Sequence, residues 1–286
     1  MEKKVLIACD STNDLSEELL ARYQIKTVPL GITLGGKHYT DGVDIGPDQI
    51  YAHYNETGEL PKTSSVNVNE YADFFARYTA QGFAVVLFTI SSEMSSSYQN
   101  ACIAKADYPD VYVVDTRNLS TGGGLLVLAA ADLAQSGESA GAIAEKCAAL
   151  VPCVDASFVI DSLEFLHKGG RCSSLAALGA NLMHIKPSIC VRDGKMSVGK
   201  KYRGKYEAVV RQYIADRLGD GSGIDLSRAF ITHAGCDAAL CEECAALARS
   251  LVPFREVLIT RAGCTISSHC GPNTLGVLFF RKEPLA

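Results

Sequence analysis

Residues 83–101, with the sequence Phe-Ala-Val-Val-Leu-Phe-Thr-Ile-Ser-Ser-Glu-Met-Ser-Ser-Ser-Tyr-Gln-Asn-Ala, decide the fold of this chain. The apolar run at 83–90 is rich in β-branched and aromatic residues and is bounded by polar ones, so it predicts a buried strand. From about Ser95 the sequence has no proline and carries Ala101 and Ile103, which favours a helix. The stretch is therefore a strand that passes through a short polar turn into a helix.

Three serines, Ser95, Ser96 and Ser97, lie at the predicted start of this helix. The first amides of a helix have no partner within it, and the helix dipole is positive at that end. Amides and hydroxyls gathered there favour an anion. The simpler interpretation is a capped helix, since serine is a good N-cap, but one cap needs only one serine. We therefore predict that Ser95 and Ser96 help to hold an anion.

The first half of the chain alternates short apolar runs with helical patterns, which indicates a parallel sheet covered by helices. In such sheets ligands bind at the carboxyl ends of the strands. Three predicted strands end in polar turns, so we expect one site where these turns meet: Asp10-Ser11-Thr12, Ser91-Ser92 and Asp115-Thr116. The predicted strands are 5–9, 27–34, 37–40, 83–90 and 111–114, and the predicted helices are 16–23, 68–80 and two over 118–151.

Pro152 interrupts the helical pattern and indicates a domain boundary. The tight turn over Arg192-Asp193-Gly194-Lys195 joins two apolar runs as a hairpin, so the second sheet is predicted to be mixed. The predicted strands beyond Pro152 are 156–160, 188–192, 196–199, 228–233, 256–260 and 275–280, and the predicted helices are 163–167, 174–183, 205–218 and 237–251.

Composition and charge exclude several classes of protein. Apolar residues make up 48% of the 286 residues and charged residues 21%, as in an ordinary globular protein with a sizeable core. The net charge of −5 argues against nucleic acid or anionic membranes as the main partner. No transmembrane segment or signal peptide is expected, and the eleven cysteines sit mostly beside apolar residues. Free buried thiols in a cytoplasmic protein are the expectation.

Three further polar residues are candidates for the anion site. Thr63 lies in another loop that is expected at a strand end, although a loop threonine is usually only a turn residue. Arg171 follows Gly169-Gly170 and offers a bidentate fork to an anion, whereas the simpler interpretation is a solvated surface arginine. His269 lies among hydroxyls and glycines in the connection 263–273, which predicts a functional histidine over a packed core residue.

Other motifs do not carry a function. The segment Gly199-Lys-Lys-Tyr-Arg-Gly-Lys-Tyr206 matches a phosphate-binding loop except at its last position, where Tyr206 replaces the hydroxyl that ligates magnesium. Cys241 and Cys244, with His233 and Cys236 upstream, resemble a zinc half-site but lie inside a predicted helix without a second pair. The sequence has no Gly-x-Ser-x-Gly motif, which weakens a serine hydrolase assignment.

The order and spacing of several short motifs resemble the DegV family of bacterial fatty-acid-binding proteins along essentially the whole chain. Many relatives carry Ser-Gly-Thr where this chain has Ser95-Ser96-Ser97, and Gly-Pro-Gly where it has Gly271-Pro272-Asn273. The matching motifs are Asp10-Ser11-Thr12, Thr63-Ser64-Ser65, Ile90-Ser-Ser-Glu-Met-Ser-Ser-Ser-Tyr-Gln-Asn-Ala101, Val114-Asp115-Thr116, Leu166-His167-Lys168-Gly169-Gly170-Arg171, Ile185-Lys186-Pro187, His233-Ala234-Gly235 and His269-Cys270-Gly271-Pro272.

The resemblance implies a three-layer α/β/α domain with a parallel sheet over residues 1–155 and a two-layer α/β domain with a mixed sheet over 156–286. A long-chain fatty acid would lie between them, with its tail in an apolar tunnel and its carboxylate against Thr63 and Ser95. The family pattern implies a lipid-binding protein rather than an enzyme, with no cofactor of its own. Some members present the carboxylate to a separate ATP-dependent fatty acid kinase, which makes acyl phosphate for phospholipid metabolism. Arg171, Arg203 and His269 match family positions that would support this transfer.

Two alternatives remain open from the sequence. The first is an acyl hydrolase or transferase in which Ser95 is the nucleophile and His269 the base. Such a pair must lie within hydrogen-bond reach, which the sequence does not show. The second is a structural or regulatory domain without a ligand.

Overall fold

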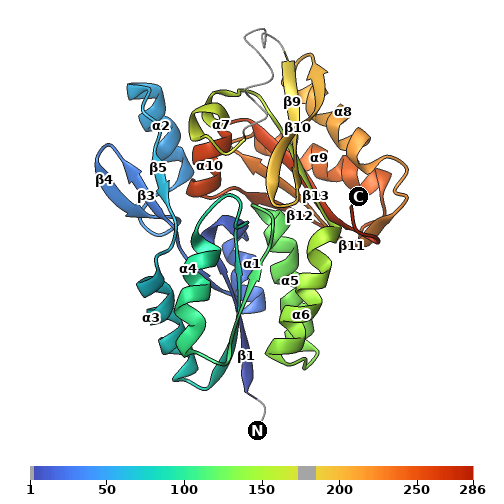
Figure 1. Cartoon of the computed structure of the whole chain (residues 1–286). Helices are drawn as coiled ribbons and strands as arrows, with labels where there is room; N and C mark the ends of the chain where they lie inside the picture. Colours follow the sequence, from blue (N-terminus) through green and yellow to red (C-terminus); the bar gives the residue numbers. More distant parts are fainter. Residues whose placement is uncertain (1–2, 173–184, 286) are drawn as a thin grey trace.

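The first half of the chain builds a four-stranded parallel sheet with the strand order β2-β1-β6-β7 (Figure 1). The structure is a computed structural model and describes residues 3–172 and 185–285. The elements of this half that form the sheet and its covering helices are β1 (Lys4–Asp10), α1 (Glu17–Tyr23), β2 (Lys26–Val28), α3 (Val68–Thr79), β6 (Phe83–Thr89), α4 (Ser97–Ala104), β7 (Val111–Asp115), α5 (Thr121–Gln135) and α6 (Ala140–Leu150), with short 3-10 turns at Ser11–Asn13, Lys105–Asp107 and Val151–Cys153.

The alternation of side chains along β6 produces three layers. Val85 and Leu87 are fully buried against α3 and α4, whereas Val86 and Phe88 are fully buried on the opposite face against α5 and α6. A strand that is buried on both faces needs a continuous apolar run, which is why 83–90 is so uniformly hydrophobic. The predicted α/β/α arrangement of this half is confirmed.

The second half forms a six-stranded mixed sheet with the order β10-β9-β8-β13-β11-β12. The predicted hairpin is confirmed, since β9 and β10 pair antiparallel with Arg192 opposite Lys195. The predicted helix 174–183 lies outside the described residues. The elements of this half are β8 (Val154–Ile160), α7 (Glu164–Gly169), β9 (Ile185–Arg192), β10 (Lys195–Arg203), α8 (Tyr206–Leu218), β11 (Ile224–Ala234), α9 (Ala238–Leu251), β12 (Glu256–Arg261), α10 (Cys264–Cys270) and β13 (Thr274–Arg281).

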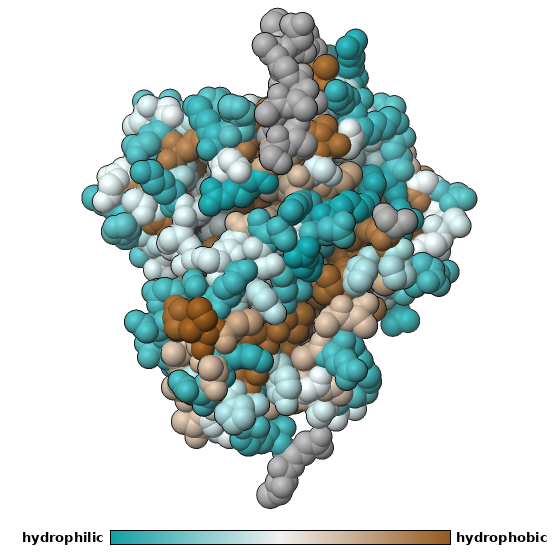
Figure 2. All heavy atoms as spheres, viewed as in Figure 1, coloured by the Kyte–Doolittle hydropathy of each residue, from teal (hydrophilic) through white to brown (hydrophobic). Residues whose placement is uncertain are grey.

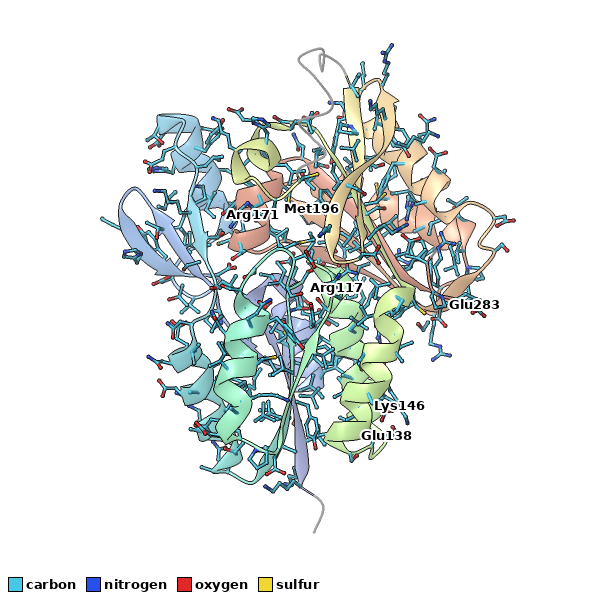
Figure 3. The ribbon with its side chains drawn as sticks, viewed as in Figure 1. Arg117, Glu138, Lys146, Arg171, Met196 and Glu283 are labelled. Atoms are coloured by element: carbon cyan, nitrogen blue, oxygen red, sulfur yellow. The ribbon has the colours of Figure 1, made fainter. Side chains whose placement is uncertain are left out.

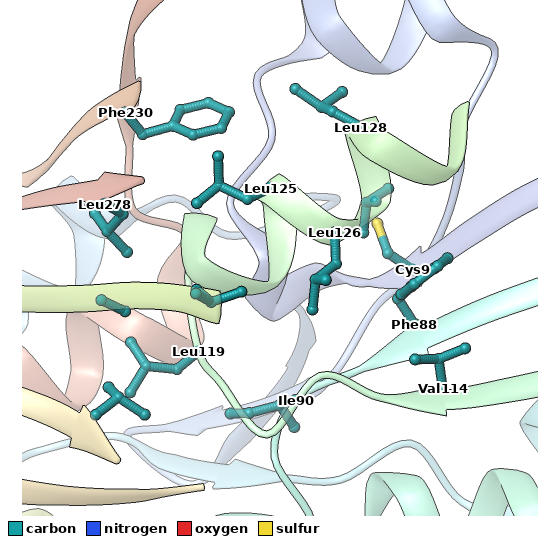
Figure 4. Close-up of a cluster of buried hydrophobic side chains, with 14 of the residues drawn as sticks. Cys9, Phe88, Ile90, Val114, Leu119, Leu125, Leu126, Leu128, Phe230 and Leu278 are labelled. Carbon is teal, nitrogen blue, oxygen red and sulfur yellow. The ribbon is translucent and has the colours of Figure 1, made fainter. Parts of the chain in front are cut away.

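Helix α5 joins the two sheets into one apolar core. Helices α8 and α9 cover one face of the mixed sheet, and its other face packs against α5. Figure 4 shows Leu125 pointing toward Phe230 and Leu278 of the mixed sheet, and Leu126 pointing toward Phe88 of the parallel sheet. The surface on the viewed side is mainly hydrophilic, with hydrophobic residues gathered in a band across the middle (Figure 2).

A third, three-stranded sheet with the order β4-β3-β5 departs from the predicted organisation. The run at 27–34 was expected as one extended segment, but it divides between β2 in the parallel sheet and β3 in the small sheet. Pro29 lies between them and has no amide for a sheet hydrogen bond, which explains the break. The turn at Gly35-Gly36 has positive φ at both glycines and is the predicted hairpin turn. The elements here are β3 (Gly31–Leu34), β4 (Lys37–Thr40), α2 (Pro47–Thr57) and β5 (Lys62–Ser64), of which α2 and β5 were not predicted.

The connection 263–273, for which no helix was predicted, contains the helix α10. Its first amides are satisfied by a carboxylate from a distant loop, as described below. None of the helices in residues 3–172 and 185–285 has the length and apolar character to cross a membrane.

Candidate functional site

A cavity of about 330 Å³ opens where the carboxyl ends of the parallel strands face α10 and the mixed sheet. This volume is within the range of about 300–1,000 Å³ that is usual for small-molecule sites. Figure 3 shows Arg171 and Met196 close together above the parallel sheet. The lining residues are Leu30, Thr63, Ser64, Ser65, Ile90, Met94, Ser95, Ser96, Leu119, Phe158, Leu166, Arg171, Met196, Thr265, Ile266, His269 and Cys270.

Five of the six site residues predicted from the sequence line this cavity, and they come from four different parts of the fold. Thr63 lies on β5, Ser95 and Ser96 lie in the turn between β6 and α4, Arg171 follows α7, and His269 lies on α10. The structure therefore brings together residues that are up to 206 positions apart in the sequence.

His269 is held as a neutral ring beside Thr63. Its Nε2 atom lies 3.0 Å from Thr63 Oγ1, and its buried Nδ1 atom has no hydrogen-bond partner among the described residues. Burial, together with the positive charge of Arg171, lowers the pKa of His269 to about 4. The Nδ1 atom lies so close to Gly169 that a Cβ there would meet it at 2.5 Å, so glycine is required at this position.

The serine turn is ordered by hydroxyl contacts. Ser95 Oγ accepts a hydrogen bond from the backbone N–H of Ser97 (3.2 Å) and lies 3.0 Å from Ser97 Oγ. Ser96 Oγ lies 2.8 Å from Ser65 Oγ, which links the turn to the loop after β5. Helix α4 begins at Ser97, two residues later than predicted, and the Ser96 side chain does not cap it. The Ser96 hydroxyl is therefore exposed at the rim of the cavity.

A buried carboxylate fixes the strand end that precedes the serine turn. Asp10, the last residue of β1, is fully buried and accepts a hydrogen bond from the Ile90 backbone N–H (2.8 Å). Its other oxygen accepts from the Thr12 N–H (3.1 Å) and from Asn13 Nδ2 (3.0 Å). Burial raises the pKa of Asp10 to about 6, against the lowering effect of these hydrogen bonds. The motif Asp10-Ser11-Thr12 thus helps to position the serine turn without lining the cavity itself.

Two further buried carboxylates hold the start of α10, and sequence reasoning did not identify this role. Asp14 accepts from the Gly263 N–H at 2.8 Å. Asp41 accepts from the N–H groups of Cys264 (2.8 Å) and Thr265 (3.1 Å) and from the Thr265 hydroxyl (2.6 Å). A carboxylate at the amino end of a helix satisfies unpaired amides and favours the helix dipole. Asp41 precedes a glycine after a predicted strand, a pattern typical of a turn, so only the tertiary contact reveals its function.

The hairpin between β9 and β10 closes the cavity on the side of the mixed sheet. Ser91 Oγ donates to the Gly194 carbonyl at 2.8 Å, and Arg117 donates to the Asp193 carbonyl. These contacts tie the tip of the hairpin to the loops that follow β6 and β7. Met196, two residues beyond the tip, is held against the cavity as a result.

A second, almost entirely apolar chamber of about 30 Å³ adjoins this cavity. The two chambers share four lining residues, which we call the neck: Leu119, Phe158, Ile266 and Cys270. The remaining residues of the second chamber are Ser120, Ala156, Ser157, Val191, Thr232, His233, Ala234, Ala262, Thr274, Gly276 and Leu278. The sequence did not indicate which residues these would be.

Arg203 does not line either chamber. It is exposed at the last position of β10, whereas Met196 lies near the first. Arg203 lies seven positions after Met196, beyond a bulge in β10 between Val198 and Lys201. The described contacts therefore group five of the predicted residues and leave Arg203 apart.

The geometry does not build a hydrolase from Ser95 and His269. Within the described residues the Ser95 hydroxyl is bonded to Ser97, and the His269 ring is bonded to Thr63. A histidine with its pKa lowered to about 4 is also a weak base at neutral pH. The contacts of these side chains suit the holding of a ligand better than attack on a carbonyl.

The neutral state of His269 makes a pH-dependent contribution to stability. Its pKa of about 4 in the folded state lies below the value of about 6.5 in an unfolded chain. The unfolded state therefore takes up the proton first, and stability is lost as the pH falls from about 6.5 through 4. When the pH is lowered from 7 to 4, the free energy of unfolding should fall by up to about 3 kcal/mol more in the unchanged chain than in the His269→Gln variant. Urea unfolding at both pH values measures this, and equal losses in the two proteins would contradict it.

Comparison with known proteins gives a consistent result along the whole chain. The model of the family described as "Uncharacterised protein, DegV family COG1307" matches residues 4–282. A DegV domain-containing protein of Clostridium acetobutylicum is 33% identical over 283 residues, covering 98% of this chain and 99% of the relative.

Two solved structures have the same fold. A DegV family protein of Thermus thermophilus, described by its fatty acid binding, has a TM-score of 0.88 at 29% identity and covers 97% of this chain and 99% of its own. A stearic acid-binding protein of Eubacterium ventriosum has a TM-score of 0.86 at 30% identity and covers 99% of both chains.

Proposed function

Because this chain belongs to the DegV family, we propose that it binds a long-chain fatty acid in the two adjoining chambers, with the carboxylate at the polar end. The observation that supports this most directly is the polarity of the cavity. Thr63, Ser95 and His269 line the first chamber, and the neck residues line both this chamber and the apolar second one. Such a division fits an amphipathic ligand with one anionic head group.

The hydrogen-bond pattern at the polar end suits a carboxylate, which only accepts. A neutral His269 donates from one nitrogen; if this is Nε2, Thr63 Oγ1 is the acceptor. The Thr63 hydroxyl proton then points away from the ring and is available to the ligand. The hydroxyls of Ser95 and Ser96 and the guanidinium of Arg171 supply further donors on the lining.

The finer proposal is that the protein presents this carboxylate to a partner ATP-dependent fatty acid kinase. The polar end carries the exposed residues Ser96 and Arg171, whereas the second chamber lies deep in the core. A partner could therefore reach the head group while the tail remains buried. We propose Arg171 and His269 as the residues that support phosphoryl transfer, with Arg203 as a further candidate through the resemblance alone.

The experiment that tests the main proposal is mass spectrometry of a solvent extract of the denatured, purified protein. Near-stoichiometric free fatty acid is the expected result. A second sample, incubated with hexadecanoate after delipidation, shows whether an initially empty protein can bind the acid. Failure of both samples to retain fatty acid would refute the proposal.

The head-group contacts predict a large loss of affinity without a loss of fold. Thr63→Val or Ser95→Ala each removes a hydrogen bond to a charged group, worth about 1.5–3 kcal/mol. We expect the affinity for hexadecanoate to fall about ten- to a hundredfold. Displacement of a fluorescent fatty acid measures this, with thermal unfolding as the check on folding. Thr33→Val is the matched control, since Thr33 lies on the same small sheet outside the cavity. Unchanged affinity in both Thr63→Val and Ser95→Ala would show that these hydroxyls do not contact the ligand.

Arg171 should matter more for transfer than for binding. Negative charge develops on the transferring phosphoryl group, and a preorganised guanidinium stabilises that charge. With the cognate kinase, Arg171→Ala should lower the rate of acyl phosphate formation at least about a hundredfold. Bound fatty acid should remain within a few-fold of the unchanged chain. Lys168→Ala is the control, because Lys168 is exposed on α7 and pairs with Glu164. Loss of lipid in proportion to activity would make Arg171 an ordinary head-group ligand.

A further inference from the structure

Two cysteines occupy a defined pair of positions at the start of α9. Asp237 is the N-cap of this helix, since its carboxylate accepts from the N–H groups of Ala239 (2.9 Å) and Leu240 (3.2 Å). Cys236 therefore precedes the cap, and Cys241 lies at the fourth helical position. Neither residue lines the fatty acid cavity.

Side chains at these two positions pack against each other in many helices and fix the direction in which the chain enters the helix. Here both are thiols in the same apolar core cluster, and each shifts the pKa of the other. Cys236 is the outer member of the pair, with 9% of its surface exposed against 2% for Cys241. A small oxidant would thus meet Cys236 first.

The surroundings of Cys236 distinguish its thiol from that of Cys241. The Tyr206 hydroxyl lies 3.4 Å from Cys236 Sγ, and the Cys236 backbone N–H points at His233 Nδ1 (3.3 Å). The interaction with the Cys241 thiol, followed by those with His233 and Tyr206, lowers the pKa of Cys236 to about 5, against the opposing effect of burial. The same interaction and burial raise the pKa of Cys241. When protonated, the Cys236 thiol donates to the Thr274 carbonyl at 3.2 Å.

We propose that Cys236 and Cys241 form a peroxide-sensitive thiol pair that closes to a disulfide. The Cys236 thiolate attacks one oxygen of hydrogen peroxide, the O–O bond breaks, and hydroxide leaves, so that the sulfur is oxidised to a sulfenic acid. The sulfur of Cys241 then attacks that of Cys236; the S–S bond forms, the S–O bond breaks, and the oxygen leaves as water with the Cys241 proton. In total, two thiols and one peroxide give one disulfide and two waters.

Closure of this disulfide changes contacts in two neighbouring elements. An S–S bond of about 2.05 Å is shorter than any contact between two free thiols, so the two sulfurs must move together. Cys236 Sγ then leaves Tyr206, the first residue of α8, and Thr274, the first residue of β13. The oxidised state therefore differs from the reduced state at the starts of three elements that cover or form the mixed sheet.

The experiment uses the reduced full-length chain. The protein is treated with a stoichiometric series of hydrogen peroxide, remaining thiols are blocked with N-ethylmaleimide, and peptides are mapped by mass spectrometry. We expect a species two hydrogen atoms lighter, with a cross-link between Cys236 and Cys241 that forms before Cys102 is oxidised. Cys102 is the internal reference because it is a half-buried thiol on α4, away from the pair.

Two variants separate the steps. Cys241→Ser should stop the reaction at the sulfenic acid of Cys236, which dimedone traps as an adduct. Cys244→Ser, a change one turn further along α9, should leave the cross-link intact. The proposal is overturned if both thiols of the unchanged chain still carry N-ethylmaleimide when Cys102 is oxidised, or if the cross-link joins other residues.

Discussion

Replacing Asp41 with alanine is expected to lower the free energy of unfolding by about 3–5 kcal/mol and to weaken fatty acid binding at the same time. Asp41 is 3% exposed and accepts four hydrogen bonds, from the backbone of Cys264, from the backbone and hydroxyl of Thr265, and from the Ser11 hydroxyl. Hydrogen bonds to a charged group contribute about 1.5–3 kcal/mol each, and water entering the gap would offset part of the loss.

The loss of the hydrogen bonds to Asp41 should also weaken fatty acid binding, because α10 carries both Ile266 and His269, which line the cavity. Urea unfolding measures the stability, and displacement of a fluorescent fatty acid measures the affinity. Asp44→Ala is the matched control in the same loop, since Asp44 is exposed and accepts only from the Thr40 backbone among the described contacts. Asp41→Asn should be intermediate, because it keeps an acceptor oxygen. A free energy of unfolding for Asp41→Ala within 1 kcal/mol of the control would refute this role for the carboxylate.

The contrast between Ser95 and Asp41 shows which features of the site can be predicted from sequence. The strand and helix around Ser95 follow from a local pattern, a continuous apolar run and then a polar turn, because burial on both faces imposes that pattern. The capping box of α3 is equally local: Asn67 and Glu70 satisfy each other's backbone amides at 3.0 and 2.8 Å, as their spacing predicts. The strand β6 and the helix α3 were predicted correctly from these local patterns, whereas α2 was missed although its first contact, between Gly46 and Gln49, is equally local.

Features that depend on distant contacts were missed. Helix α10 is seven residues long, too short to be stable alone, and its amides are satisfied by Asp41 from 223 residues away. The contact of Thr63 with His269 joins two candidates that the sequence identified separately, and only the fold places them 3.0 Å apart. The neck at Phe158 and Ile266 likewise depends on how two sheets pack around α5. The sequence thus identified much of the polar end of the site, but not the residues that position it or that line the tail.

The apolar lining predicts strong discrimination between long and short fatty acids. Each methylene transferred from water to an apolar chamber contributes about 0.8 kcal/mol, so the eight methylenes that distinguish hexadecanoate from octanoate contribute roughly 6 kcal/mol before the ordering of the tail is deducted. We expect hexadecanoate to bind at least about a hundredfold more tightly than octanoate. A chain-length series, measured by displacement of a fluorescent fatty acid at one fixed salt concentration, tests this.

Repeating the chain-length series with Thr63→Val separates the tail from the head group. Thr63 lies at the polar end and does not line the second chamber, so its loss should weaken both acids by the same factor. The ratio of the two affinities should therefore stay constant, because it depends on the apolar residues that contact the tail. A ratio that collapses in the variant would mean that the head group determines how deeply the tail enters. Equal affinity of the unchanged chain for eight- and sixteen-carbon acids would place the tail in solvent, since no buried apolar surface would then distinguish them.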